Sequence, residues 1–233
     1  ISFDTDGKRL INGKRYNTSV TSLVFINNNK DADSTNIQTV LGNAIDTIAK
    51  DIFDGKIVKY TDSFSIRVNG NKSVNKSYAS TFKDEKLFDN VIQYWKDIKK
   101  SLDDEQFKYI TGVTIFDESG LNGEIDLLLI DKDGKVKVAD FKTSSKKFII
   151  SNLSKGVSQY SGMSKMGEFA TQGYLYAEIL KNNLGLEVDN EIMILGQSLS
   201  FDKKDSEGKE IAPIDAKILN IEPINGIISP FTN

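Results

Sequence analysis

The chain has 233 residues, of which 39% are hydrophobic and 27% charged, and this composition is typical of a folded globular domain. It contains no cysteine and no histidine, which excludes disulfides, thiolate and imidazole metal sites, and histidine-dependent catalysis, so any metal must be bound by oxygen. The formal charge of −3 argues against coating of nucleic acid by bulk electrostatics, although a local basic groove is compatible with it.

Two helices are predicted in the N-terminal half. Apolar residues recur at helical spacing from Ser34 to Phe53, and Gly55 follows as a helix-terminating glycine. The stretch 69–80 lacks periodicity and is expected to be an exposed loop. The second helix follows this loop, with a capping box formed by Thr81 and Asp84.

The remainder of the chain predicts strands and a third helix. The predicted strands are Phe107–Phe116, Glu124–Ile130, Lys135–Lys142, Glu191–Leu199 and Ala216–Ile221, and the predicted helix runs from about Ser164 to Lys181. This order of elements indicates an α/β fold, with a central mixed β-sheet flanked by helices, in a single domain that spans residues 1–233.

Charged side chains continue the apolar rows of two of these strands. Glu124 and Asp126 share their strand phase with Leu128, while Asp140 and Lys142 share theirs with the two valines that precede them. One interpretation is a functional cluster at the edge of the core. The alternative is that the aspartates are solvated strand ends and that Glu124 and Lys142 form an ordinary salt bridge.

The turn between these two strands sets how the rows meet. A three-residue loop, 132–134, with glycine at the left-handed position, pairs Ile130 with Val136 and Asp126 with Asp140. A two-residue Asp-Gly loop would separate the charged rows instead. Directly opposed residues have Cβ atoms about 4.5–5.5 Å apart, and two carboxylates in such positions destabilise a sheet unless a cation or a shared proton lies between them. A divalent ion would resolve the conflict.

The pattern resembles the active site of the PD-(D/E)xK nuclease superfamily, in particular its RecB-like exonuclease branch. The family places an aspartate on one strand of a central hairpin, matched by Asp126, and D-x-K on the next, matched by Asp140 and Lys142. A helical Q-x-x-x-Y follows, matched by Gln172 and Tyr176. The resemblance implies a restriction-endonuclease-like core.

Two earlier segments extend the resemblance. Ser19 and Thr21 belong to an S-V-T that looks like the one in phage exonucleases and in the mitochondrial genome-maintenance exonuclease group. Gly42 and Asp46 resemble the G-x-x-x-H helix of RecB-like families, with aspartate in place of a metal-ligating histidine. Ser19 could instead be a helix N-cap, and Asp46 could lie on a solvated helix face. Ile125 replaces the proline of the family name.

The resemblance implies a metal-dependent DNA nuclease that hydrolyses phosphodiester bonds. Asp126, Asp140, the main-chain carbonyl of Phe141 and Asp46 would hold Mg²⁺ or Mn²⁺. Lys142 would orient or deprotonate the attacking water. Gln172 and Tyr176 would position the substrate and the lysine as further catalytic residues. The residues implied to contact substrate are Ser19, Thr21 and Lys146, although Lys146 could equally be a solubilising charge.

DNA is the expected partner, and a helicase or recombination protein could accompany the chain. The resemblance favours an exonuclease, whereas the residues themselves do not distinguish exonuclease from endonuclease. One alternative is a catalytically inactive nucleic-acid-binding or assembly module, and another is a structural metal-binding domain. No long apolar run or signal-peptide core is present, so we expect a cytoplasmic protein with no membrane partner, phage-like in type. Its first residue, Ile1, suggests that the domain belongs to a longer chain.

Overall fold

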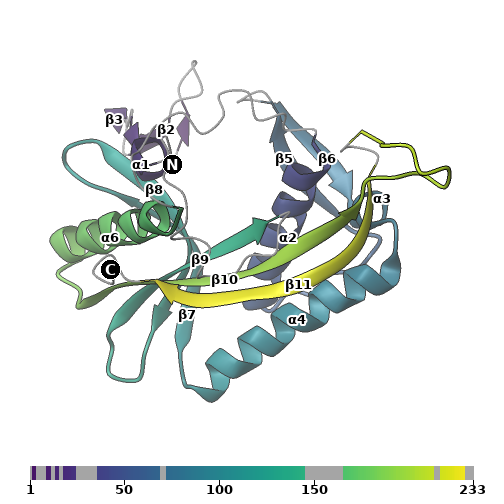
Figure 1. Cartoon of the computed structure of the whole chain (residues 1–233). Helices are drawn as coiled ribbons and strands as arrows, with labels where there is room; N and C mark the ends of the chain where they lie inside the picture. The colour runs from purple at the N-terminus through teal and green to yellow at the C-terminus, as the bar shows by residue number, and fades with distance from the viewer. Residues whose placement is uncertain are drawn as a thin grey trace.

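A mixed sheet of six strands lies at the centre of the described part of the chain. The computed structural model describes residues 2–3, 9–11, 14–15, 18–24, 36–68, 72–144, 165–212 and 216–228. The strands of this sheet are β4 (Thr18–Ser19), β7 (Lys108–Phe116), β8 (Leu121–Ile130), β9 (Val136–Ser144), β10 (Val188–Asp202) and β11 (Lys217–Ile228). They are ordered β11-β10-β9-β8-β4, and β7 also pairs with β8 (Figure 1).

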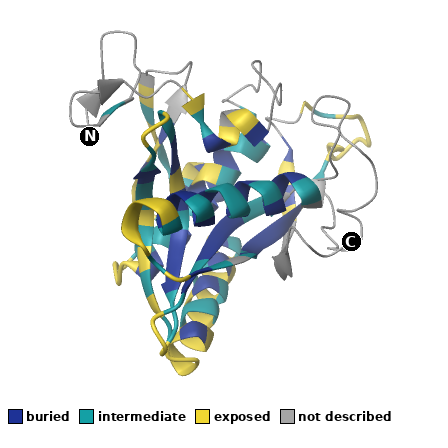
Figure 2. Ribbon diagram, turned by 90° about the vertical axis from the view of Figure 1, so that its left-hand side faces the viewer, coloured by how far each residue is buried: buried dark blue, intermediate teal, exposed yellow. Residues whose placement is uncertain are grey.

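Helices cover both faces of the sheet. On one face, α2 (Ile37–Phe53) and α4 (Glu85–Asp104) pack their apolar stripes against Leu127, Leu129, Ala139 and Phe141. On the other, α1 (Val20–Val24) and α6 (Lys165–Leu184) pack against Leu128, Val136, Val138 and Ile194. Figure 2 shows the buried sheet behind α6. These layers confirm the predicted α/β fold with a mixed central sheet flanked by helices.

The hairpin of β8 and β9 has the predicted register. Ile130 pairs with Val136 and Leu128 with Val138. Asp131 donates its amide to the carbonyl of Lys135 across a loop of three residues, and the last of these, Gly134, has a φ of 85°. A left-handed glycine at this position is what a three-residue hairpin loop requires, so the turn chemistry fixes the register.

The prediction that Glu124 and Asp126 share one inward face of β8 with Leu128 is wrong, because the side chains do not alternate regularly between the two faces along this strand. Ile125 packs in the same core cluster as Leu128, although the two residues are three positions apart and would lie on opposite faces of a regular strand. Glu124 and Asp126 form ion pairs with Lys50 of α2. The two acids therefore face α2, whereas Leu128 packs in the cluster under α6.

The segment predicted as a loop between the first two long helices is mostly structured. Strand β6 (Lys72–Ser77) pairs antiparallel with β5 (Ser63–Val68), and α3 (Tyr78–Phe82) follows directly. Ser77 caps α3. Thr81 lies within α3, so the predicted capping box does not exist, and Asp84 alone caps α4. This mostly polar strand is stable in this place because its partner β5 supplies Phe64 and Ile66 to the core, and its own Val74 packs against the same core.

The C-terminal strands are longer than predicted. Strand β10 pairs parallel with β9 and antiparallel with β11, so it is central in the sheet. A small sheet of β1 (Ser2–Phe3), β2 (Arg9–Ile11) and β3 (Lys14–Arg15) lies near the N-terminus. Within the described ranges, no helix is long and apolar enough to cross a lipid bilayer.

Candidate functional site

The candidate site lies where β8 and β9 separate. Their ladder runs from Ile130–Val136 to Leu127–Ala139 and ends there. Beyond this point β9 continues beside β10 and β8 continues beside β7. The charged residues predicted from the sequence lie on the separating parts of these two strands, and not within the ladder.

The side chain of Asp126 takes the place of the next ladder bond. Its Oδ2 accepts a hydrogen bond of 3.0 Å from the backbone amide of Phe141. The predicted backbone pairing of Asp126 with Asp140 is therefore not formed as a ladder pair. The two carboxyl groups still interact directly, and each changes the proton affinity of the other.

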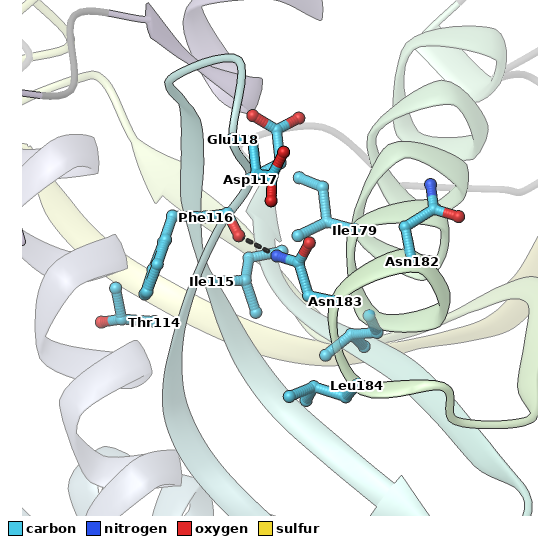
Figure 3. Close-up of a pocket in the computed structure, with 10 residues that line it drawn as sticks. Thr114, Ile115, Phe116, Asp117, Glu118, Ile179, Asn182, Asn183 and Leu184 are labelled. Atoms are coloured by element: carbon cyan, nitrogen blue, oxygen red, sulfur yellow. Dashed lines mark hydrogen bonds between the residues drawn. The ribbon is translucent and has the colours of Figure 1, made fainter.

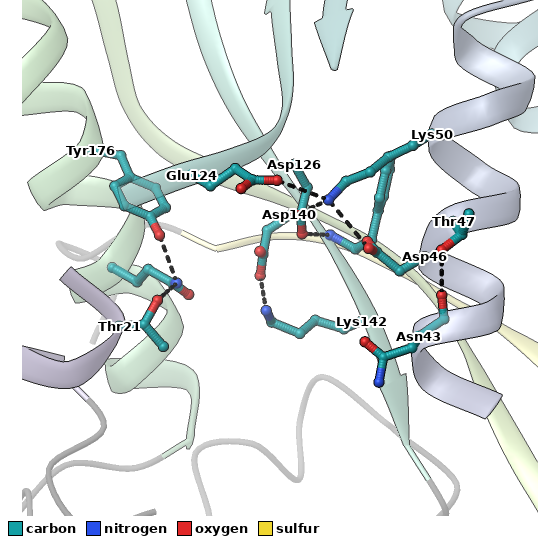
Figure 4. A network of polar contacts seen from close by, with 12 residues as sticks. Thr21, Asn43, Asp46, Thr47, Lys50, Glu124, Asp126, Asp140, Lys142 and Tyr176 are labelled. Atoms are coloured by element: carbon teal, nitrogen blue, oxygen red, sulfur yellow. Dashed lines mark hydrogen bonds and ion pairs between the residues drawn. The ribbon is translucent and has the colours of Figure 1, made fainter. Parts of the chain in front are cut away.

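Lys50 of α2 lies among three acidic side chains (Figure 4). Its Nζ is 3.1 Å from Asp126 Oδ1, 3.2 Å from Asp46 Oδ2 and 3.5 Å from Glu124 Oε1. Burial alone would lower the pKa of Lys50, but these carboxylates raise it above its ordinary value, so the ammonium stays charged. A single cation thus holds acids from a helix and a strand together.

Helix α2 reaches the site through a close contact at Gly42. A Cβ at this position would lie 2.8 Å from Thr143 Oγ1 of β9, which is closer than real contacts of this kind. The absence of a side chain allows the helix to approach the strand. Asp46, one turn further on, then faces the cluster, as the G-x-x-x-D pattern predicted.

Asp140 and Lys142 meet on the side of the sheet that faces α6. The ammonium of Lys142 forms an ion pair with Asp140 Oδ2, and it lies 5.1 Å from the ring centre of Phe169 in α6. Asp140 is only 5% exposed. The Asp140–Lys142 pair therefore lies between α6 on one side and the acids around Lys50, on α2 and β8, on the other.

The three aspartates differ in proton affinity. Burial raises the pKa of Asp140 to about 7, with Asp126 adding to the rise and Lys142 opposing it. Burial and Asp126 raise the pKa of Asp46 to about 6 against the effect of Lys50. Burial would also raise the pKa of Asp126, but the two lysines hold it below its usual value. Negative charge is thus concentrated on Asp126, while Asp140 exchanges a proton near neutrality.

Helix α6 brings Gln172 and Tyr176 to the same region. The Gln172 amide donates to Tyr176 Oη at 3.1 Å and to Thr21 Oγ1 at 3.3 Å, while its Oε1 has no partner among the described residues. A Cβ on Gly123 would lie 2.6 Å from the Tyr176 ring, so the ring packs directly on β8 beside Glu124. The predicted Q-x-x-x-Y pair thus forms one hydrogen-bonded unit with Thr21.

The structure says less about three other predicted site residues, Ser19, Lys146 and Phe141. Ser19 ends β4 and directly precedes α1, two residues before Thr21. Lys146 lies outside the described residues, so its predicted contact with substrate stays a prediction. The backbone amide of Phe141 bonds to Asp126, and the role of the Phe141 carbonyl as a metal ligand stays a prediction.

The carboxylate oxygens of this site suit a hard divalent cation, but the ammonium groups of two lysines lie between the carboxylates. Across the described ranges, no group of three or more acidic side chains is arranged to hold a metal ion directly. Asp46 and Asp126 are bridged by Lys50, and Asp140 is paired with Lys142. Oxygen ligands of this kind are those that Mg²⁺ and Mn²⁺ prefer. The residues therefore fit such an ion chemically once an ammonium moves aside.

Lys50 is the residue of this cluster that the sequence interpretation missed. It lies four residues after Asp46, a spacing that places acid and lysine on one face of a helix. That spacing alone is common on solvated helices. Only the tertiary packing of α2 on β9 brings Lys50 to Glu124 and Asp126.

A separate pocket of about 490 Å³ lies between β7 and the C-terminal end of α6 (Figure 3). It is lined by Ile115, Phe116, Asp117, Glu118, Asn183 and Leu184 among others. Asn183 donates to the carbonyl of Phe116 across it. None of the acids or lysines of the cluster lines this pocket, so it is distinct from the candidate site.

No protein-family model matches the chain, and no curated protein is similar enough to be matched. Its function must therefore be inferred from the chemistry of its own side chains.

Proposed function

We propose that the chain is a metal-dependent deoxyribonuclease with a PD-(D/E)xK-type site in a restriction-endonuclease-like core. The observation that carries the proposal is the meeting of Asp126, Asp140 and Lys142 where β8 and β9 separate. Buried charges of opposite sign, gathered at the end of a strand pair, are costly for folding and typical of a reaction site. A purely structural role would be served better by apolar side chains.

Asp126 and Asp140 would hold the metal ion, with Asp46 as a third ligand and the carbonyl of Phe141 as a fourth. A bound Mg²⁺ or Mn²⁺ would polarise the scissile phosphate and lower the pKa of an attacking water. The low pKa of Asp126 keeps one ligand ionised at neutral pH. Asp140, with a pKa of about 7, would release its proton as the cation binds.

Lys142 would act on the attacking water and on the phosphate. Hydrolysis forms a bond from the water oxygen to phosphorus and breaks the bond from phosphorus to a sugar oxygen, which leaves with a proton. The ammonium of Lys142 can hold the water by a hydrogen bond and neutralise charge that develops on the phosphate. Its contact with Asp140 keeps it at the reacting centre.

The unit of Gln172, Tyr176 and Thr21 would position the substrate. Gln172 and Tyr176 are almost completely buried, at 4% and 2% exposure, whereas Thr21 is exposed. The unit thus links a buried hydrogen-bond network to a hydroxyl that a DNA strand could reach. Gln172 Oε1, which has no partner among the described residues, remains as an acceptor.

A second candidate is a nucleic-acid-binding module of the same fold without turnover. The position of Lys50 favours this alternative, because its ammonium lies within 3.5 Å of three of the acids. Ca²⁺ separates the two candidates, since it commonly supports binding at oxygen sites without the tight octahedral geometry of Mg²⁺.

Single- and double-stranded DNA, labelled at the 5′ or the 3′ end, test the proposal. We expect the fragments to shorten in Mg²⁺ or Mn²⁺ and to stay intact in EDTA, and the label that is lost first reports the polarity. Binding of DNA in Ca²⁺ with no cleavage in Mg²⁺ or Mn²⁺ would favour the binding module. Absence of both binding and cleavage would contradict both candidates.

A further inference from the structure

The ammonium of Lys50 is surrounded by carboxylates, as a bound cation would be. In this it differs from a lysine in a surface salt bridge. Its ammonium has three N–H donors, and three carboxylates lie within 3.5 Å of it. The side chain is 23% exposed. Lys56, three residues after the end of α2, pairs with its chain neighbours Asp51 and Asp54 and is 60% exposed.

The acids around Lys50 could not remain this close without a positive charge. Asp46 and Asp126 each place a carboxylate oxygen within 3.2 Å of the Lys50 ammonium, and like charges this close in a partly buried place repel when no cation lies between them. Lys50 is therefore the cation that contacts both of them directly in the metal-free protein.

We propose that Lys50 is a built-in cation that holds Asp46, Glu124 and Asp126 together and must leave when a divalent ion binds to two of these carboxylates, Asp46 and Asp126. The inference rests on the proposed metal site. A divalent ion bonds to carboxylate oxygen at about 2.0–2.1 Å for Mg²⁺, and an ammonium in contact with the same oxygens would repel it. The flexible four-carbon stem of lysine allows the ammonium to move outward.

Competition of this kind sets the metal concentration at which the site fills. Metal binding has to displace the ammonium, so loss of the Lys50 charge should tighten binding even though it removes a favourable contact from the metal-free protein. We expect a change of about tenfold in the dissociation constant, which corresponds to about 1.4 kcal/mol. The same variant should be less stable in EDTA and should recover on addition of metal.

Calorimetric titration of the whole chain with Mg²⁺ and with Mn²⁺, without DNA, tests the inference. Lys50→Met removes the charge and keeps most of the stem, Lys50→Arg keeps the charge, and Lys56→Met, just after the end of the same helix, is the matched control. We expect Lys50→Met to bind about tenfold tighter, and Lys50→Arg and Lys56→Met to bind no tighter than the parent. Equal or weaker binding by Lys50→Met would overturn the proposal.

A measurement on the unchanged chain covers the case in which Lys50→Met does not fold. The NMR signals of the Lys50 side chain should shift in parallel with metal binding, whereas those of Lys56 should not. A Lys50 signal that stays constant at saturating metal would overturn the proposal.

Cleavage assays separate this inference from the proposed function. If the parent binds metal and Lys50→Met binds it tighter, but neither cleaves DNA, the nuclease assignment fails and the role of Lys50 stands. If the parent cleaves DNA and Lys50→Met needs the same metal concentration, the role of Lys50 fails and the nuclease assignment stands.

Discussion

The carboxylate of Asp126 accepts the backbone amide of Phe141 at 3.0 Å, at the point where the ladder between β8 and β9 ends. A side chain thus closes the hairpin where a backbone carbonyl would normally do so. This bond keeps the Asp126 carboxylate against Asp140 while the two strands separate, and it makes one residue part of both the fold and the candidate site.

Asp126→Ala should therefore destabilise the metal-free protein as well as abolish metal-dependent cleavage. The change leaves the Phe141 amide without its acceptor and removes a charge from Lys50, which should cost about 1–3 kcal/mol. Thermal unfolding in EDTA measures the loss, with Asp133→Asn in the exposed turn as the control. A midpoint equal to that of the parent would show that the Asp126–Phe141 bond contributes nothing to folding.

The stability of the metal-free protein should fall as the pH rises from 5 to 8. The pKa of Asp140 is about 7 in the folded chain and near 3.8 when unfolded, so the folded state binds the proton more tightly. Its contribution is complete below the unfolded value and is lost as the pH passes through about 7. Asp46, with a pKa of about 6, acts in the same direction.

Melting curves in EDTA across this range give the slope, and Asp140→Asn should flatten it because the amide does not titrate. The variant should melt above the parent at pH 8 and closer to it at pH 5. An Asp140→Asn profile parallel to that of the parent would show that Asp140 is already ionised throughout.

Gly42→Ala should destabilise the chain, although alanine normally stabilises a helix interior relative to glycine by about 0.5–1 kcal/mol. The new Cβ would lie 2.8 Å from Thr143 Oγ1 and would push α2 away from β9. In a Thr143→Ala background, which removes that oxygen, the same substitution should be neutral or stabilising. A stabilising effect of Gly42→Ala in the unchanged chain would mean that α2 does not approach β9 this closely.

The parts of the site that the sequence predicts are those fixed by local chemistry. The left-handed Gly134 sets the hairpin register, and the spacing of four residues sets the pairing of Gln172 with Tyr176. The break in strand alternation after Ile125 and the entry of Lys50 into the acid cluster depend on how α2 and α6 pack on opposite faces of the sheet. No pattern within a single segment encodes either feature.

The wrong prediction of a loop for the stretch 69–80 has a similar cause. Residues 72–77 are polar apart from Val74, and they form a strand because β5 pairs with them and supplies Phe64 and Ile66 to the core. A strand stabilised by its partner carries little hydrophobic pattern of its own.

Gln172→Ala and Tyr176→Phe should reduce cleavage more than they reduce metal affinity. Both residues contact each other on α6 and would act on the substrate, whereas the carboxylates lie on α2, β8 and β9. Tyr176→Phe keeps the ring packed on Gly123 and removes only the hydroxyl. Cleavage rates and calorimetric metal affinities should be compared with those of Tyr60→Phe, whose hydroxyl donates to Ala79 away from the site. Parallel losses of metal affinity and cleavage would refute this division of roles.

The central claim is that Asp140 and Lys142 carry metal-dependent DNA hydrolysis, and matched variants of β9 test it most directly. End-labelled DNA should be incubated in Mg²⁺ with the parent, Asp140→Asn, Lys142→Met and Lys137→Met. The last is a control on the same strand, where Lys137 pairs with Asp189 at 3.4 Å and does not contact the site. We predict cleavage by the parent and by Lys137→Met, and a loss of at least about a hundredfold in the other two. Cleavage by Asp140→Asn and Lys142→Met at the rate of the parent, or no cleavage by the folded parent, would contradict the claim.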